Sequence, residues 1–334
     1  MGILDIFSDD GFSVLDLTGL VNNEPYAPKQ LSQLGIFEEE GVTTTTVAFD
    51  KINGVLTLVG PTPRGGPGET VAKDRGSLLA IPVEHFQRDD AVMADEVQGR
   101  RMLGSADMKE DLQRLIVKRS MKHFRDFDAT LEHQRIGAIK GIVLDKNGNT
   151  RLNLFTAFDE SAQSTVDFDL DNANPASGAF RKKCDTVIET IEDALGADSY
   201  DGIHAICGRG FYRDVLSHKE VVESFKNTAF ANVLRAGMPR TFEFGDITWE
   251  RYRTGGASGF VNDDECHLFP VGVPELFKTY FAPADYIETV NTEGFPRYVK
   301  QVRMDNDKGI RVEIQSNPLS VCRKPQVLVN GTKT

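Results

Sequence analysis

The alternation of apolar and polar positions predicts two long helices. Over residues 106–136, apolar side chains recur every three to five positions, which places them on one side of a helix. Ser105 is a suitable N-cap, and Gly137 or Gly141 can end the element. At 1.5 Å per residue this helix would span roughly 45 Å, so we interpret it as a rigid spine. A second, amphipathic helix is expected over residues 180–195.

Extended segments precede the predicted spine. β-Branched or apolar residues cluster at 43–49, 55–59 and 77–83. The stretch between the last two, 60–76, holds five glycines and three prolines, which are typical of turns. We therefore expect residues 41–92 to form a long β-ribbon with a flexible tip. A ribbon of two strands is marginally stable alone in water, so it should dock on a partner.

The first 40 residues show no core-like spacing. Phe7, Phe12 and Leu15 are apolar but loosely spaced, and Pro25 interrupts any regular element. We interpret residues 1–40 as an arm with a helical start. Such an arm cannot bury its own apolar side chains, so we expect it to lie on another surface.

The remainder of the chain mixes short helices and strands. Residues 202–207 resemble a buried strand, 211–225 a helix and 241–253 extended chain. This alternation indicates a mixed module over about 176–290. The predicted fold class of the whole chain is therefore α+β.

Charge and composition narrow the function classes. Lysine and arginine total 38 against 50 aspartates and glutamates, a formal net charge of −12. Proteins that bind nucleic acid through its phosphates normally carry a basic surplus, so a nucleic-acid reader is not expected. The predicted spine is nevertheless locally basic. Such a face is either solvated, paired with carboxylates, or in contact with a neighbouring subunit or DNA, and its members are Arg114, Lys118, Arg119, Lys122 and Arg125.

Targeting signals and cysteine chemistry are not predicted. Residues 1–12 carry three aspartates and no basic residue, which is the wrong charge for a signal peptide. No stretch of about 18 apolar residues predicts a membrane span. The cysteines lie far apart and form no CxxC pair, so we expect buried free thiols in a reducing cytoplasm, at Cys184, Cys207, Cys266 and Cys322.

A search for catalytic and ligand-binding motifs identifies weak candidates. His204 and Cys207 would interest a search for thiol proteases, but on one short strand they face opposite sides, so structural roles are favoured. The acidic run 263–265 could bind a divalent ion, although a solvated turn is the commoner interpretation. The glycines of 255–259 suggest a mobile loop. We expect no catalytic residue, metal or cofactor.

Specific short motifs, in the same order over nearly the whole chain, point to one family. The chain resembles the lambda-type major capsid proteins of tailed bacteriophages, the phage major capsid protein E family. The matching segments are Phe7-Ser8-Asp9-Asp10, Leu34-Gly35-Ile36-Phe37, Pro63-Arg64-Gly65-Gly66-Pro67-Gly68, Ala94-Asp95-Glu96-Val97-Gln98-Gly99-Arg100-Arg101, Arg135-Ile136-Gly137-Ala138-Ile139-Lys140-Gly141, Pro274-Glu275-Leu276-Phe277 and Gln315-Ser316-Asn317-Pro318-Leu319.

The resemblance implies the fold shared by tailed-phage and herpesvirus capsids. Its expected parts are an N-terminal arm (1–40), an extended loop (41–92), a peripheral domain (93–175 and 295–334) with spine helix 106–136, and an axial domain (176–294).

The resemblance also implies a structural role. The subunit would exchange its arm and ribbon with neighbouring copies and assemble in the bacterial cytoplasm into hexamers and pentamers of an icosahedral shell. The shell would expand as DNA is packaged, and the subunit would become part of the virion. Implied partners are a scaffolding protein, a portal, a decoration or head-stabilising protein and packaged double-stranded DNA, held non-specifically; no membrane is involved. An acidic shell would not adhere to that DNA.

Candidate subunit contacts follow from the unsupported segments. The ribbon tip is locally positive on an acidic chain, and we hypothesise that it pairs with an acidic neighbour. Some relatives cross-link this ribbon through a lysine, for which Lys73 is the position to suspect, although the lambda-type branch resembles proteins reinforced by decoration. The candidates are Phe7, Phe12, Phe37, Arg64, Lys73, Arg75, Arg114 and Arg119.

Two other functions remain open at this point. A soluble α+β enzyme would bring His204, Cys207 or residues 263–265 into a concave pocket. A non-viral nanocompartment shell of the same fold would form particles that enclose protein instead of DNA.

Overall fold

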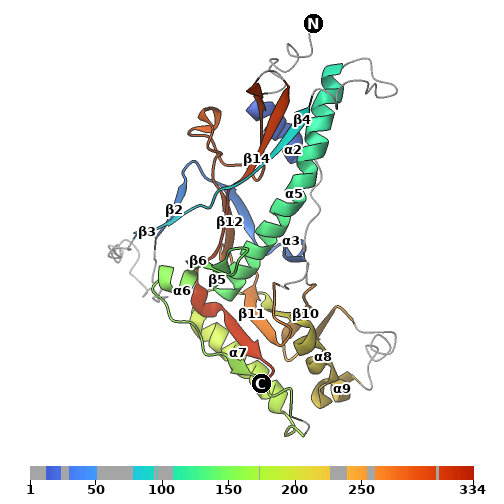
Figure 1. The fold of residues 1–334 in the computed structure, drawn as a ribbon. Coiled ribbons are helices and arrows are strands. Elements are labelled where there is room, and N and C mark those ends of the chain that lie inside the picture. Colours follow the sequence, from blue (N-terminus) through green and yellow to red (C-terminus); the bar gives the residue numbers. More distant parts are fainter. Residues whose placement is uncertain are drawn as a thin grey trace, which may run out of the picture. The chain divides into compact units, whose positions relative to one another are not determined.

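Helices and strands alternate along the chain in the computed structural model (Figure 1). The structure describes residues 13–23, 30–50, 78–93, 96, 108–172, 174–225, 239–253, 260–305 and 308–334. The helices are α2 (Val14–Asn23), α3 (Gln30–Leu34), α5 (Met108–Lys140), α6 (Leu154–Ala157), α7 (Ala179–Leu195), α8 (Arg209–Ser217) and α9 (Lys219–Phe225), with 3-10 turns η2 (Ile287–Thr289) and η4 (Pro325–Val327).

The strands confirm the expected α+β class. They are β1 (Glu38–Gly41), β2 (Thr46–Asp50), β3 (Leu78–Pro82), β4 (Phe86–Met93), β5 (Ile142–Leu144), β6 (Thr150–Asn153), β7 (Val166–Asp167), β8 (Gly202–Cys207), β9 (Thr241–Phe244), β10 (Ile247–Arg251), β11 (Glu265–Val271), β12 (Phe277–Phe281), β13 (Tyr298–Arg303), β14 (Gly309–Ser316), β15 (Pro318–Cys322) and β16 (Val329–Thr332).

The described residues fall into two compact units. Unit 1 takes those within 1–47, 80–135 and 278–320, and unit 2 takes those within 48–79, 136–277 and 321–334. Unit 1 holds the antiparallel sheet β13-β14-β4, and unit 2 holds a six-stranded sheet in the order β7-β16-β11-β8-β10-β9. None of the described helices is long and apolar enough to span a membrane.

Helix α2 corrects the expectation that residues 1–40 form an arm whose apolar side chains are not buried within the subunit. Leu17 and Val21 lie one turn apart on the same face and are both fully buried. They pack into the core of unit 1 beside Val299 of β13. Ser13 caps the helix, because its hydroxyl oxygen accepts a hydrogen bond of 3.2 Å from the backbone amide of Asp16. Residues 1–12 lie outside the described part.

Strand β1 extends the same correction. It pairs in parallel with β12, so that Glu39 lies beside Thr279 in the ladder. The amide of Gly294 donates to the carbonyl of Val42 at 3.0 Å, which holds the chain just beyond the strand. Much of the predicted arm is thus built into its own subunit.

The predicted β-ribbon over 41–92 is correct only in part. Strands β2 and β3 pair as a two-stranded sheet. Strand β4, however, pairs antiparallel with β14 over its full length, from Phe86 opposite Ser316 to Met93 opposite Gly309. Residues 86–93 therefore belong to the sheet of unit 1. The predicted strand 55–59 and the glycine-rich stretch 60–76 lie outside the described residues.

The spine helix extends beyond its predicted end at residue 136. Helix α5 runs to Lys140, and Gly141 ends it in the left-handed region at φ +78°. Gly137 has another role. A Cβ atom there would lie 2.8 Å from the Cα of Val143, so glycine permits the close approach of β5 to the helix.

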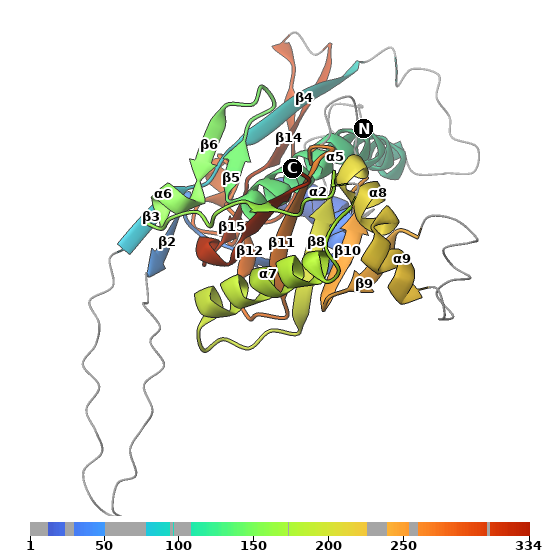
Figure 2. The ribbon, with the colours of Figure 1, turned by 90° about the horizontal axis from the view of Figure 1, so that it is seen from below.

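Unit 2 is built around an aromatic core. Trp249 of β10 is fully buried, and the ring of Phe180 on α7 lies 5.7 Å from it, so α7 packs on the six-stranded sheet (Figure 2). The expected helix over 211–225 is instead two helices, α8 and α9. They are separated by His218, whose extended backbone (φ −63°, ψ 139°) breaks the helical hydrogen bonding.

We predict that α2 contributes measurably to the stability of the unassembled subunit. Leu17→Ala should lower the free energy of unfolding by about 2–5 kcal/mol, because it leaves a cavity in the core of unit 1. Leu20→Ala on the same helix, where the leucine is 43% exposed, should change it by less than about 0.5 kcal/mol. Urea denaturation measures both. Equal losses would show that α2 does not stabilise this core.

Candidate subunit interface

The exposed face of α5 is basic. Arg114, Lys118, Lys122 and Arg125 point to solvent, whereas Phe124 between them is fully buried. The four exposed positions are spaced by three or four residues, which aligns them along one side of the helix. Lys118, Lys122 and Arg125 form no ion pair with another described residue. Lys118, Lys122 and Arg125 therefore form a charged strip available to a partner of opposite charge.

Arg119 differs from these residues because it is engaged within its own unit. Its guanidinium contacts the carboxylate of Glu96, the carbonyl of Ala91 and, at 3.9 Å, the carboxylate of Asp90. Burial alone would raise the pKa of Asp90, but the hydrogen bond from His123 and the charge of Arg119 bring that pKa below its usual value. Arg119 therefore fixes β4 on α5.

A buried arginine of α5 holds the strand β1. Arg135 is 2% exposed and donates to Glu39 at 2.6 Å, to the hydroxyl of Ser32 at 2.9 Å and to Thr279 at 3.2 Å. Its guanidinium also lies 5.2 Å from the ring centre of Phe37. A buried charge costs several kcal/mol unless it is fully hydrogen-bonded, so these groups act as one cluster.

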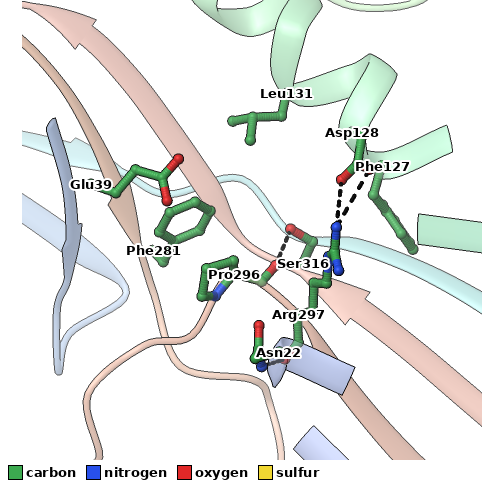
Figure 3. A pocket seen from close by; sticks show the side chains of 9 residues that line it. All are labelled: Asn22, Glu39, Phe127, Asp128, Leu131, Phe281, Pro296, Arg297 and Ser316. Atoms are coloured by element: carbon green, nitrogen blue, oxygen red, sulfur yellow. Dashed lines mark hydrogen bonds and ion pairs between the residues drawn. The ribbon is translucent and has the colours of Figure 1, made fainter. Parts of the chain in front are cut away.

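Beside this cluster lies a cavity of about 230 Å³ within unit 1 (Figure 3). Arg297 points from the start of β13 toward Asp128 on α5, at 3.4 Å, and lies 5.2 Å from the ring centre of Phe124. The one hydroxyl in the lining, Ser316, donates to the carbonyl of Pro296 at 2.8 Å. In this lining the charges of Arg297 and Asp128 neutralise each other, and the hydroxyl of Ser316 is used in a hydrogen bond to a backbone carbonyl. Within the lining that the structure describes, no base lies beside this hydroxyl to activate it as a nucleophile. Its residues are Asn22, Glu39, Phe127, Asp128, Leu131, Phe281, Pro296, Arg297 and Ser316.

The residues of the enzyme alternative do not line this cavity. His204 is buried and bonds Glu250 at 3.0 Å, and Cys207 is fully buried. Within the acidic run, Asp264 pairs with Lys333 at 2.7 Å, which raises the pKa of that lysine. Among the described residues, no group of histidines, cysteines and carboxylates has the geometry to hold a metal.

The cysteine expectation is confirmed: the cysteines are free and buried. Burial raises the pKa of the Cys184 thiol to about 12, so it stays protonated at neutral pH. The loop 255–259 lies outside the described residues.

The predicted contact residues have different positions. Phe37 is 8% exposed, and its ring packs beneath Arg135 inside the subunit. Its role in subunit contact stays a prediction, and this burial argues against it. Arg114 is exposed on α5. Arg119 is engaged within its own unit by Glu96 and Ala91. The other five candidates lie outside the described residues and stay predictions: Phe7, Phe12, Arg64, Lys73 and Arg75.

Sequence reasoning missed the ion pairs made by Asp128 and Arg135, two buried charged residues of α5. Asp128 and Arg135 occupy positions seven residues apart on α5, in the same stripe as Phe124 and Leu131. A charged residue inside an apolar stripe is the signal that could have identified them. Their partners, Glu39 and Arg297, are too distant in sequence to be paired from spacing alone.

We predict unequal effects from removing two adjacent carboxylates of β1. Glu39→Ala leaves the buried Arg135 guanidinium without its anionic partner and should lower the free energy of unfolding by about 2–3 kcal/mol. Glu40→Ala removes a 3.2 Å pair with Lys278, which is less buried than Arg135 and keeps Glu38 at 3.8 Å as a second carboxylate, so it should cost at most about 1 kcal/mol. Urea midpoints of the unassembled chain compare them. Similar losses would rule out a special role for the Arg135 cluster.

Comparison with known proteins agrees with this architecture. The sequence matches the family described as phage major capsid protein E over residues 13–333. It is 27% identical to the major capsid protein of Salmonella phage Felix O1 (isolate Felix O1-VT1), over 96% of this chain and 95% of that protein. It is 26% identical to the major capsid protein of Pseudomonas phage KPP10, over 96% and 97%.

A solved structure shows the fold independently. A candidate capsid protein of a prophage from E. coli CFT073 superposes with a TM-score of 0.59 at 16% identity, over 96% of this chain and 99% of that one. The tailed-phage capsid fold expected from the sequence is thus confirmed. The chain belongs to the phage major capsid protein E family.

Proposed function

We propose that this chain is the major capsid protein of a tailed phage, and that its copies assemble into the icosahedral shell around the double-stranded DNA genome. The observation that carries the proposal is the family match over residues 13–333, together with an α+β architecture of the same fold. The role is structural.

The proposed mechanism is the burial of many modest surfaces between copies. Each contact contributes little binding free energy by itself, but symmetry repeats it many times, so that the closed shell is stable. Because single contacts are weak, a wrongly placed subunit can dissociate during assembly. Because α2 and β1 are part of the subunit's own core, we limit the exchanged segments to residues 1–12 and the tip between β2 and β3. The shell then expands as DNA enters.

We propose a peripheral and an axial domain whose boundaries follow the two compact units and so differ from those expected from the sequence. Unit 1, with most of α5 and the sheet β13-β14-β4, supports a peripheral domain. Unit 2, with the six-stranded sheet, supports an axial domain. Strand β16 pairs with β11, so we assign the C-terminal strand to the axial domain instead of the peripheral one. We assign residues 136–175 to the axial domain as well, because they belong to unit 2.

The proposed partners follow from the shell. A scaffolding protein, a portal and a decoration protein would contact the assembled subunits, first in the bacterial cytoplasm and then in the virion. With a formal net charge of −12, the subunit as a whole repels packaged DNA, so contact with DNA is non-specific and confined to local basic surfaces. The exposed strip on α5 is one such surface.

The purified full-length chain should form closed particles. Negative-stain electron microscopy and sedimentation velocity should show large shells above a threshold concentration and dissociated subunits below it, because weak contacts assemble cooperatively. A chain that stays a monomer or small oligomer at every concentration would contradict the proposal. Virion particles that protect protein cargo but no DNA from digestion would favour the nanocompartment alternative.

The ribbon-tip hypothesis predicts salt-dependent assembly. Reversing Arg64, Lys73 and Arg75 to glutamate should block assembly at low salt, because it replaces three proposed attractions to an acidic neighbour with repulsions. Lys146→Glu, in the exposed turn between β5 and β6, is the control for charge reversal and should assemble normally. Light scattering follows both. Normal shells from the triple variant would end the hypothesis.

A further inference from the structure

The loop between β12 and β13 exposes large apolar side chains. Ile287 is 90% exposed, Val290 61% and Phe295 44%. Five other large hydrophobic residues of the described chain are also exposed, but none as far as Ile287 or Val290. We call Ile287, Val290 and Phe295 the apolar tip. Three exposed large apolar side chains within nine residues of one loop indicate a surface that becomes covered by a partner.

The apolar tip is supported by a well-bonded loop. Thr289 is fully buried, and its hydroxyl is 2.7 Å from the carbonyl of Ala284 and 3.0 Å from that of Tyr286. The amide of Phe295 donates to the hydroxyl of Tyr298 at 2.8 Å. Its neighbour Gly294 is buried, and a Cβ atom there would lie 1.9 Å from the carbonyl oxygen of Phe281. Little conformational entropy is therefore lost when this loop meets a partner.

The charge beside the tip is largely neutralised within the loop. The ammonium group of Lys300 lies 2.9 and 3.0 Å from the two carboxylate oxygens of Glu288, and its hydrogen bond lowers the pKa of that carboxyl. The same ammonium lies 4.6 Å from the ring centre of Tyr286. The other charged residues of the loop are Asp285 and Glu293, which are exposed and negative, and Arg297, which is buried against Asp128. The surface therefore does not attract a polyanion such as DNA.

The size of the tip favours a second copy of this chain over a different protein. A stable binary complex buries about 800 Å² on each partner, more than three partly exposed side chains supply. In a shell, by contrast, a small contact is repeated by symmetry and becomes effective through multivalency. We infer that the apolar tip is a subunit contact, buried against a second copy of this chain during assembly. The inference rests on the proposed shell-forming function.

A paired substitution tests the energetic role of the tip. Ile287→Asp combined with Val290→Asp should leave the urea midpoint of the unassembled chain unchanged, because both side chains already face water. It should raise the threshold concentration for assembly by at least about tenfold, since two apolar groups are lost from the contact. Val222→Asp, at a valine 38% exposed on α9 of unit 2, is the control and should assemble at the wild-type threshold. Unchanged assembly of the paired variant would overturn the inference.

A thiol at the tip tests its burial directly. The natural cysteines are buried, so Ile287→Cys introduces a reactive thiol with little background. Its reaction with a maleimide should be at least about tenfold slower in particles than in free subunits, because the neighbouring copy covers it. An equal rate in the two states would refute the contact.

The identity of the covering partner requires a cross-link. A benzophenone maleimide attached to that thiol before assembly, then photolysed in particles, should give covalent dimers of this chain by mass spectrometry. Cross-links to another protein only would overturn the choice of partner. If the wild-type chain forms no particles, the proposed function fails and the inference with it. If wild-type particles form but the thiol stays reactive in them, the inference alone fails.

Discussion

The core of unit 1 depends on the need to satisfy charges buried in the apolar face of α5. Phe124 and Leu131 of this face are buried, and Asp128 and Arg135 lie among them. An unpaired charge at such a depth would be too costly for a marginally stable fold, so each needs a partner brought from elsewhere. Glu39 meets Arg135 and Arg297 meets Asp128. The two ion pairs thereby fix β1 and the start of β13 against the same helix.

This constraint explains why the N-terminal segment is part of the core. Arg135 also bonds Ser32, and Asn22 donates to the carbonyl of Arg297 at 2.9 Å. Both polar contacts orient the segment, while Leu17 and Val21 supply apolar area. Neither contribution alone would hold a ten-residue helix in place, because isolated helices of that length are marginal in water. The buried apolar side chains and the hydrogen bonds together hold the segment in place.

Local patterns were sufficient to predict the long elements but not the long-range pairing. The periodicity over 106–136 and 180–195 identified α5 and α7, because apolar side chains recur every three to five positions along both helices, although charged residues interrupt the stripe of α5. The burial of α2 could not be predicted from local periodicity, since the strand β13 on which it packs follows almost 300 residues later. The pairing of β4 with β14 was missed for the same reason, and a local hairpin was favoured. The ion pairs of the buried Asp128 and Arg135 are the part of the candidate site that could not be predicted from spacing alone.

The revised position of the N-terminal segment changes where the cohesion of a shell must originate. If α2 and β1 stabilise their own subunit, the energy they contribute is already used before assembly and is not available between copies. Cohesion then has to come from surfaces that stay solvent-exposed in the subunit, and these differ in chemistry. The basic strip on α5 responds to charge and salt, whereas the apolar tip, with Glu288 neutralised by Lys300, does not. A shell that uses both kinds of contact can retain its apolar contacts at salt concentrations that weaken its electrostatic ones.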